Sequence, residues 1–114
     1  MIHVKRIYEP PLKDDGFRIL IERLWPRGFT KEKAALDLWL KEIAPSSDLR
    51  KWFAHDVSKW EEFRKHYLSE LKDNKKAVGQ LKDYIARGTV TLIYSARDER
   101  HNGAVVLKEF LERL

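Results

Sequence analysis

Two arginines flank a tryptophan in the segment Arg23-Leu24-Trp25-Pro26-Arg27-Gly28. Guanidinium groups held at fixed positions bind phosphate or carboxylate through paired hydrogen bonds. Residues 17–21, shortly before this segment, are apolar except for Arg18 and rich in branched side chains, which is typical of a buried strand. The proline and the glycine then end that strand, because proline has no N–H to donate and glycine permits unusual backbone angles. The pattern predicts an anion-binding site at the carboxyl end of a strand, where open α/β sheets usually bind ligands.

A second group of polar residues follows residues 90–94, a run that is β-branched or aromatic at most positions and predicts a strand. Arg97 and Asp98 come soon after it. If this strand lies parallel beside the strand at 17–24, both carboxyl ends bring Arg97 close to the two arginines of the first segment. Three guanidinium groups in one place need counter-charge, which favours anion binding. Asp98 is either a general base or orienting carboxylate, or it pairs with Arg97 or Arg23 and closes the loop.

Four further residues complete the candidate site. Asn102 is placed to cap a last helix, whose first N–H groups also attract anions. Arg50 lies on a short aromatic helix and points either into the same crevice or into water. His55, with an ordinary pKa of about 6.5, either transfers protons or bonds the last carbonyls of that helix. Trp25 either walls the pocket or covers the edge of the sheet. The predicted anion-binding residues are Arg23, Arg27, Arg50, Arg97 and Asn102.

Several kinds of chemistry lack their usual markers. Cysteine is absent, which excludes disulfides and thiolate sites and favours a reducing cytoplasm. No histidine pair has metal-ligand spacing, and neither a glycine-rich nucleotide loop nor a serine-hydrolase elbow occurs, so we expect no metal and no cofactor. The start of the chain does not form a signal peptide, and no apolar run reaches membrane-spanning length. We therefore expect a cytoplasmic protein without a membrane partner.

The balance of charge leaves the class of partner open. The chain has 23 Lys and Arg against 18 Asp and Glu, a net charge of +5, which favours anionic partners. A small anionic ligand, phosphate-bearing or nucleotide-like, is the first hypothesis. The alternative is a nucleic-acid-binding or regulatory module that uses basic helix faces, and a third is a partner-binding domain without chemistry. The sequence decides neither between enzyme and binding protein nor the oligomeric state.

The elements that position these residues form one α/β domain over residues 1–114. Strands at 2–8, 17–24 and 90–94, with helices between and after them, predict a small, mainly parallel sheet flanked by helices. The short loop between the first two strands leaves an antiparallel pairing open. Thr30 is predicted to cap a helix whose apolar face is Leu36, Trp39, Leu40 and Ile43, and Trp39, Trp52 and Trp60 are expected in the core.

The chain resembles, along nearly its whole length, the YeaO-like family of small bacterial and archaeal proteins. The matching segments are Glu22-Arg23-Leu24-Trp25-Pro26-Arg27-Gly28, Ala44-Pro45-Ser46, Leu49-Arg50-Lys51-Trp52-Phe53, His55-Asp56, and Thr91-Leu92-Ile93-Tyr94 through Asp98 to Asn102. The resemblance implies a shared pocket at these residues and no settled activity. This chain has Glu22 where the family has aspartate, Arg97 where it has lysine and Gly103 where it usually has histidine. The missing histidine argues against an imidazole mechanism at the last helix, and His101 is expected to point elsewhere.

Overall fold

A four-stranded parallel sheet with the strand order β1-β4-β2-β3 forms the centre of the molecule. The computed structural model describes all residues 1–114. The strands are β1 (Ile2–Arg6), β2 (Phe17–Leu20), β3 (Leu38–Trp39) and β4 (Val90–Tyr94). The helices are α1 (Lys31–Ala34), α2 (Ser47–Phe53), α3 (Trp60–Asp73), α4 (Lys75–Arg87) and α5 (Gly103–Glu112). The predicted α/β domain with a small parallel sheet is confirmed. No helix is long and apolar enough to cross a lipid bilayer.

Strand β4 is the central strand on which the sheet is built. Val90 at its start pairs with Ile2 of β1 on one side and with Phe17 of β2 on the other. All five residues of β4 are buried, which accounts for its continuous run of β-branched and aromatic side chains. The antiparallel pairing left open for β1 and β2 is wrong, because the two strands do not pair with each other. The chain between them passes across β4 instead.

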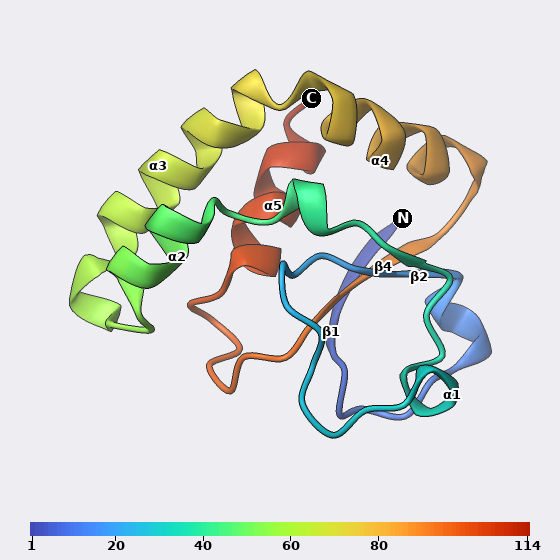
Figure 1. Ribbon diagram of the computed structural model, residues 1–114. Helices are drawn as coiled ribbons and strands as arrows, with labels where there is room; N and C mark the ends of the chain where they lie inside the picture. The colour runs from blue at the N-terminus through green and yellow to red at the C-terminus, as the bar shows by residue number, and fades with distance from the viewer.

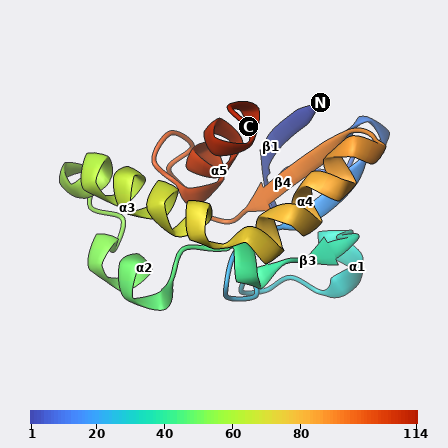
Figure 2. The ribbon, with the colours of Figure 1, turned by 90° about the horizontal axis from the view of Figure 1, so that it is seen from above.

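The longer helices lie on one face of the sheet, over the main core (Figures 1 and 2). Alternate residues of the strands, such as Ile19 and Leu92, point into this core and are fully buried. Helices α3 and α4 follow each other in an arch above the sheet in Figure 1. The Tyr67 hydroxyl donates a hydrogen bond to the carbonyl oxygen of Ile43 at 2.7 Å, which fixes α3 against the segment that enters α2.

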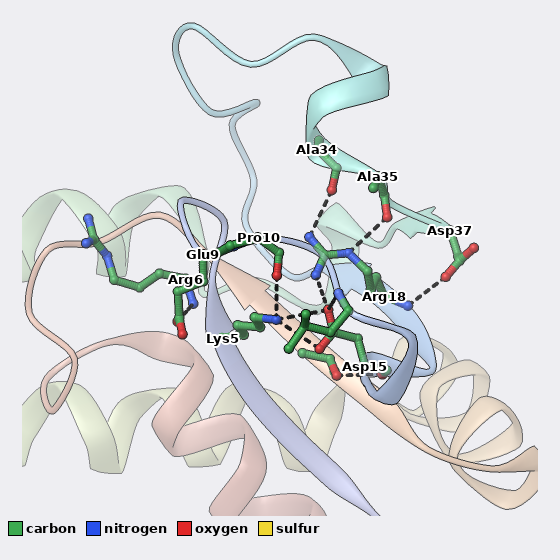
Figure 3. A network of polar contacts seen from close by, with 11 residues as sticks. Lys5, Arg6, Glu9, Pro10, Asp15, Arg18, Ala34, Ala35 and Asp37 are labelled. Atoms are coloured by element: carbon green, nitrogen blue, oxygen red, sulfur yellow. Dashed lines mark hydrogen bonds and ion pairs between the residues drawn. The ribbon is translucent and has the colours of Figure 1, made fainter.

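The opposite face is covered by irregular chain, with a smaller core of Ile7, Leu20, Ala34 and Ile93. Beside this core lies a buried polar network (Figure 3). The Arg18 guanidinium donates to an Asp15 carboxylate oxygen at 2.6 Å and to the carbonyl oxygens of Ala34 and Ala35 at 2.9 Å each. The Lys5 ammonium lies 3.0 Å from the same carboxylate.

Asp15 is the anion at the centre of this network. Burial pushes its pKa upward, but hydrogen bonds from the Leu12 N–H, Lys5 and Arg18 outweigh burial, so the pKa of Asp15 lies below its ordinary value. Its carbonyl oxygen also accepts a hydrogen bond from the Thr91 hydroxyl at 2.6 Å. Asp15 therefore ties the connection between β1 and β2 to the central strand.

The long helix predicted from Thr30 to Ile43 is wrong. Thr30 caps a helix as expected, but α1 ends after one turn at Ala35, which has a left-handed φ of 49°. The cause is tertiary, because Arg18 takes carbonyl oxygens that a longer helix would use. Asp37 then exchanges hydrogen bonds with the backbone of Arg18, and the chain enters the sheet as β3.

The three tryptophans predicted to lie in the core differ in how far they are buried. Trp39 lies half-buried on β3, and Trp60 lies half-buried at the start of α3, packed against Phe63. Trp52 is 39% exposed on α2, with the Lys59 ammonium 5.1 Å from its ring centroid. The predicted core role is therefore wrong for Trp52, because Leu49 and Phe53 are the buried residues of that short helix.

Candidate functional site

A cleft of about 860 Å³ lies beyond the carboxyl ends of β2 and β4. Three stretches of chain, from residues 21–27, 44–55 and 95–103, line it together with Phe63 of α3. The first follows β2, the second contains α2, and the third joins β4 to α5. The cleft contains every residue proposed for the site from the sequence, namely Arg23, Trp25, Arg27, Arg50, His55, Arg97, Asp98 and Asn102.

Three of the four arginines have no partner within the protein. Arg27, Arg50 and Arg97 are exposed, and their guanidinium groups form no ion pair or hydrogen bond. Arg23 is half-buried and donates at 3.3 Å to two carbonyl oxygens, at Ala44 and Pro45. Both bonds are longer than the usual 2.7–3.2 Å for this donor type and leave other guanidinium N–H groups free.

The lining of the cleft is positively charged. Besides the four arginines it includes Lys51, and the acidic residues that line it are Glu22 and Asp98. Five cationic side chains therefore surround two carboxylates. An open cleft with such an excess raises the local concentration of anions, and its volume is in the usual range for small-molecule sites, about 300–1,000 Å³.

Helix α2 is held in place at its start, which positions Arg50. The Ser46 hydroxyl caps the helix by accepting the Leu49 N–H at 3.2 Å. The Glu70 carboxylate on α3 accepts hydrogen bonds from the Ser46 N–H at 2.9 Å and from its hydroxyl at 2.6 Å. Arg50 thus extends from a fixed helix, and it both lines the cleft and is exposed to solvent, so the structure does not choose between its two predicted orientations.

Asp98 organises the loop between β4 and α5. One carboxylate oxygen accepts the N–H groups of Arg100 and His101 at 2.9 and 3.0 Å, and the other lies 2.8 Å from the His101 Nδ1. These contacts, led by the Arg100 N–H, hold the pKa of Asp98 below its ordinary value. The loop-closing interpretation therefore describes the geometry, with His101 as the partner in place of an arginine.

His101 lines the cleft, contrary to the expectation that it points elsewhere. Its ring packs edge-on against Trp60, with the centroids 5.1 Å apart. Because Asp98 holds Nδ1, Nε2 is the ring nitrogen left without a protein partner. Sequence reasoning missed this pair, although an aspartate and a histidine three positions apart in a turn is a detectable signal.

Asn102 is a buried cap, only 4% exposed. Its Oδ1 accepts the Val105 N–H at 3.1 Å, and its Nδ2 donates to the Asp98 carbonyl oxygen at 2.9 Å. The predicted capping role is confirmed. Because both ends of the amide are used, any contribution of Asn102 to anion binding is indirect, through the free N–H groups that it leaves at the start of α5.

Replacing Asn102 by alanine is expected to lower the free energy of unfolding by about 1–2 kcal/mol, because the variant loses a buried cap. Urea denaturation followed by circular dichroism measures this change. Thr30→Ala is the control, since it removes an exposed cap from the single turn α1 and is expected to lower the free energy of unfolding less. Equal losses in both variants would contradict a special role for Asn102.

His55 and Trp25 occupy the rim of the cleft in different ways. His55 follows α2 with a left-handed φ of 59°, and its exposed imidazole forms no hydrogen bond, so it does not bond the last carbonyls of the helix. The Trp25 indole donates to the Phe29 carbonyl oxygen at 2.7 Å and packs against Trp39 of β3. Trp25 therefore serves both of its predicted roles, lining the cleft and covering the sheet.

One further pair links the two central strands. The Ser95 hydroxyl, just after β4, donates at 2.6 Å to the carboxylate of Glu22, just after β2. Both side chains are half-buried and line the cleft. Sequence reasoning did not select either of them as a site residue. Glu22 falls inside the strand predicted at 17–24 and Ser95 directly follows the strand at 90–94, and both lie in segments that carry the resemblance to the YeaO-like family.

The fold and the cleft define a small α/β domain with a positively charged, ligand-sized site at the carboxyl edge of a parallel sheet. Residues 1–114 match the family model described as the inactive DUF488-N3 subclade, and the chain belongs to this family. It is 44% identical over 113 residues to the uncharacterized protein YeaO of Escherichia coli (strain K12), covering 99% of this chain and 98% of that protein.

Mycobacterial relatives extend this comparison. The chain is 36% identical over 110 residues to the uncharacterized protein Rv3073c of Mycobacterium tuberculosis (strain H37Rv), covering 96% of this chain and 92% of that protein. The same values describe the uncharacterized protein Mb3100c of Mycobacterium bovis. No solved structure matches the chain. The resemblance to the YeaO-like family is therefore confirmed over nearly the full length.

Proposed function

We propose that the protein binds a small anionic ligand, phosphate-bearing or nucleotide-like, in the cleft. The observation that carries this proposal is the group of three exposed guanidinium groups, from Arg27, Arg50 and Arg97, that line one cleft without a protein partner. Guanidinium groups bind phosphate oxygens in pairs of hydrogen bonds. The first N–H groups of α5, beside Gly103 in the cleft lining, add further donors.

Two observations favour binding without turnover. The description of the family model calls the subclade inactive. In addition, the lowered pKa of Asp98 makes its carboxylate a weak base near neutral pH, where a base of higher pKa transfers protons more effectively. We place this binding activity in the cytoplasm, in keeping with the absence of cysteine from the chain.

Thermal-shift measurements with inorganic phosphate, pyrophosphate, AMP and acetate test the proposal. A bound ligand at a hundred times its dissociation constant adds about 2.7 kcal/mol, enough to raise the melting temperature by several degrees. The substitution Arg27→Ala is expected to weaken binding of the phosphate-bearing probes about tenfold or more, since it removes charge-assisted hydrogen bonds. The unliganded stability should stay within about 0.5 kcal/mol, because Arg27 is exposed.

The control is Arg87→Ala, which removes an exposed arginine from the end of α4, outside the cleft. It should leave binding unchanged. If no phosphate-bearing probe shifts the melting temperature, or if both variants bind equally well, the cleft is not the anion site. Binding of an oligonucleotide with a steep salt dependence, equal in both variants, would instead support the basic helix faces.

A further inference from the structure

A carboxylate without an ion pair stands among the cations of the cleft. Glu22 accepts one side-chain hydrogen bond, from the Ser95 hydroxyl to Oε1. It forms no ion pair, although five cationic side chains line the same cleft. Oε2 accepts no hydrogen bond from the protein. Because an ionised carboxylate has about four acceptor positions, Glu22 keeps capacity for a ligand.

The surroundings of Glu22 hold this acceptor in a fixed place. Its backbone carbonyl oxygen accepts the Trp39 indole N–H at 2.6 Å, which anchors it to β3. Its carboxylate is anchored to Ser95, which follows the fully buried strand β4. Glu22 is thus half-buried, with its backbone tied to β3 and its carboxylate tied to the end of β4, unlike a mobile surface side chain. A site arranged in this way selects for a donor on the ligand.

A purely anionic ligand would leave this acceptor without a partner. Phosphate oxygens accept hydrogen bonds and carry negative charge, so Glu22 repels them. The arginines suit the phosphate, and Glu22 with Ser95 suits a neutral donor. Hydroxyl groups are such donors, and acidic residues after strands of α/β sheets bind ribose hydroxyls in dinucleotide-binding proteins.

Building on the proposed function, we infer that Glu22 and Ser95 recognise adjacent hydroxyl groups, so that the ligand class is a phosphorylated ribose, free or within a nucleotide. One hydroxyl donates to the free Oε2 of Glu22. Its neighbour donates to a remaining lone pair of Oε1 or of the Ser95 hydroxyl oxygen. The cationic side of the cleft holds the phosphate.

Calorimetric titration with AMP, 2′-deoxy-AMP and 3′-deoxy-AMP tests this inference, since the three probes share the base and the phosphate. Removal of either hydroxyl should weaken binding about tenfold, because each leaves part of a half-buried acceptor unpaired. Glu22→Gln keeps an oxygen for the Ser95 hydroxyl and replaces Oε2 by an amide donor. In this variant the three probes should bind within about twofold of one another, and inorganic phosphate should bind at least as tightly as before.

Two more variants and one more probe sharpen the test. Glu62→Gln makes the same change at an exposed position of α3 outside the cleft and should keep the preference for AMP. Ser95→Ala should reduce the preference while keeping phosphate binding. Ribose 5-phosphate distinguishes a free sugar phosphate from a nucleotide as the ligand. It should bind as tightly as AMP if the ligand is a free sugar phosphate, and more weakly if the protein also recognises the base.

The two proposals fail in different ways. If the wild type binds all three adenosine monophosphates equally, or if the preference survives Glu22→Gln, then Glu22 and Ser95 only join β2 to β4 and the inference is overturned. The proposed function still holds in that case, because phosphate is bound. If no phosphate-bearing probe binds the wild type, both proposals are overturned.

Discussion

Replacing Arg18 by alanine is expected to lower the free energy of unfolding by about 3–5 kcal/mol. The Arg18 guanidinium is buried, and its removal deprives Asp15 of its closest cationic partner. The carbonyl oxygens of Ala34 and Ala35 also lose their donor, and a buried acceptor without a donor costs about 1–3 kcal/mol. Urea denaturation monitored by tryptophan fluorescence measures the change. Trp25 and Trp39 contribute to this signal, and both pack against the small core that contains Ala34.

Arg113→Ala is the matched control for this prediction. Arg113 also pairs with a carboxylate, that of Glu109 at 3.3 Å, but its side chain is 72% exposed. An exposed pair of this kind contributes about 0–1 kcal/mol. The loss of unfolding free energy in Arg18→Lys should fall between those of the two alanine variants. An ammonium group keeps the charge but lacks the planar set of donors with which a guanidinium binds several acceptors at once. Equal losses in the two alanine variants would show that the buried network does not stabilise the fold.

Replacing Gly16 by alanine is expected to lower the free energy of unfolding by about 3 kcal/mol. Gly16 adopts φ 63° and ψ −132°, a combination that residues with a Cβ rarely adopt. A Cβ at this position would lie 2.3 Å from the Thr89 carbonyl oxygen, a backbone atom that also accepts the Phe17 N–H at 2.9 Å. Relief of the clash would therefore disturb the start of β2. Differential scanning calorimetry should show a clear loss of melting temperature.

Gly79→Ala should instead raise the free energy of unfolding. Gly79 lies inside α4, where a Cβ would meet nothing within 4 Å. Alanine is the better helix former, so this variant should gain about 0.5–1 kcal/mol. A loss of stability in Gly79→Ala comparable to that in Gly16→Ala would show that neither φ nor the contact with Thr89 causes the loss at Gly16.

The sequence predicted well those elements that local patterns determine. The strand at 90–94 and the cap at Asn102 follow from β-branched composition and from side-chain capping, and both are confirmed. The segment after Thr30 shows the limit of this reasoning. Its apolar residues recur with helical spacing, yet Arg18, distant in the sequence, takes the carbonyl oxygens that a helix would need. Local periodicity does not reveal a hydrogen-bond donor that comes from another strand.

The candidate site was predictable to a similar extent. One topological rule, that parallel strands end at the same edge, was enough to collect the arginines from two distant segments into one cleft. Their anion-binding role stays a prediction. The contacts between His101 and Asp98 and between Ser95 and Glu22 depend on the path of loops and on side-chain direction. Neither of these is encoded in residue spacing alone.

The central place of β4 has a consequence for folding during synthesis. β1 and β2 are made early, but each pairs with β4, which is made only after helices α1 to α4. Until residues 90–94 emerge, neither strand has that neighbour. Contacts of such high sequence separation slow folding, and unpaired strands are exposed to aggregation. We therefore infer that the sheet closes only after residues 90–94 have been made, when β4 inserts between β1 and β2.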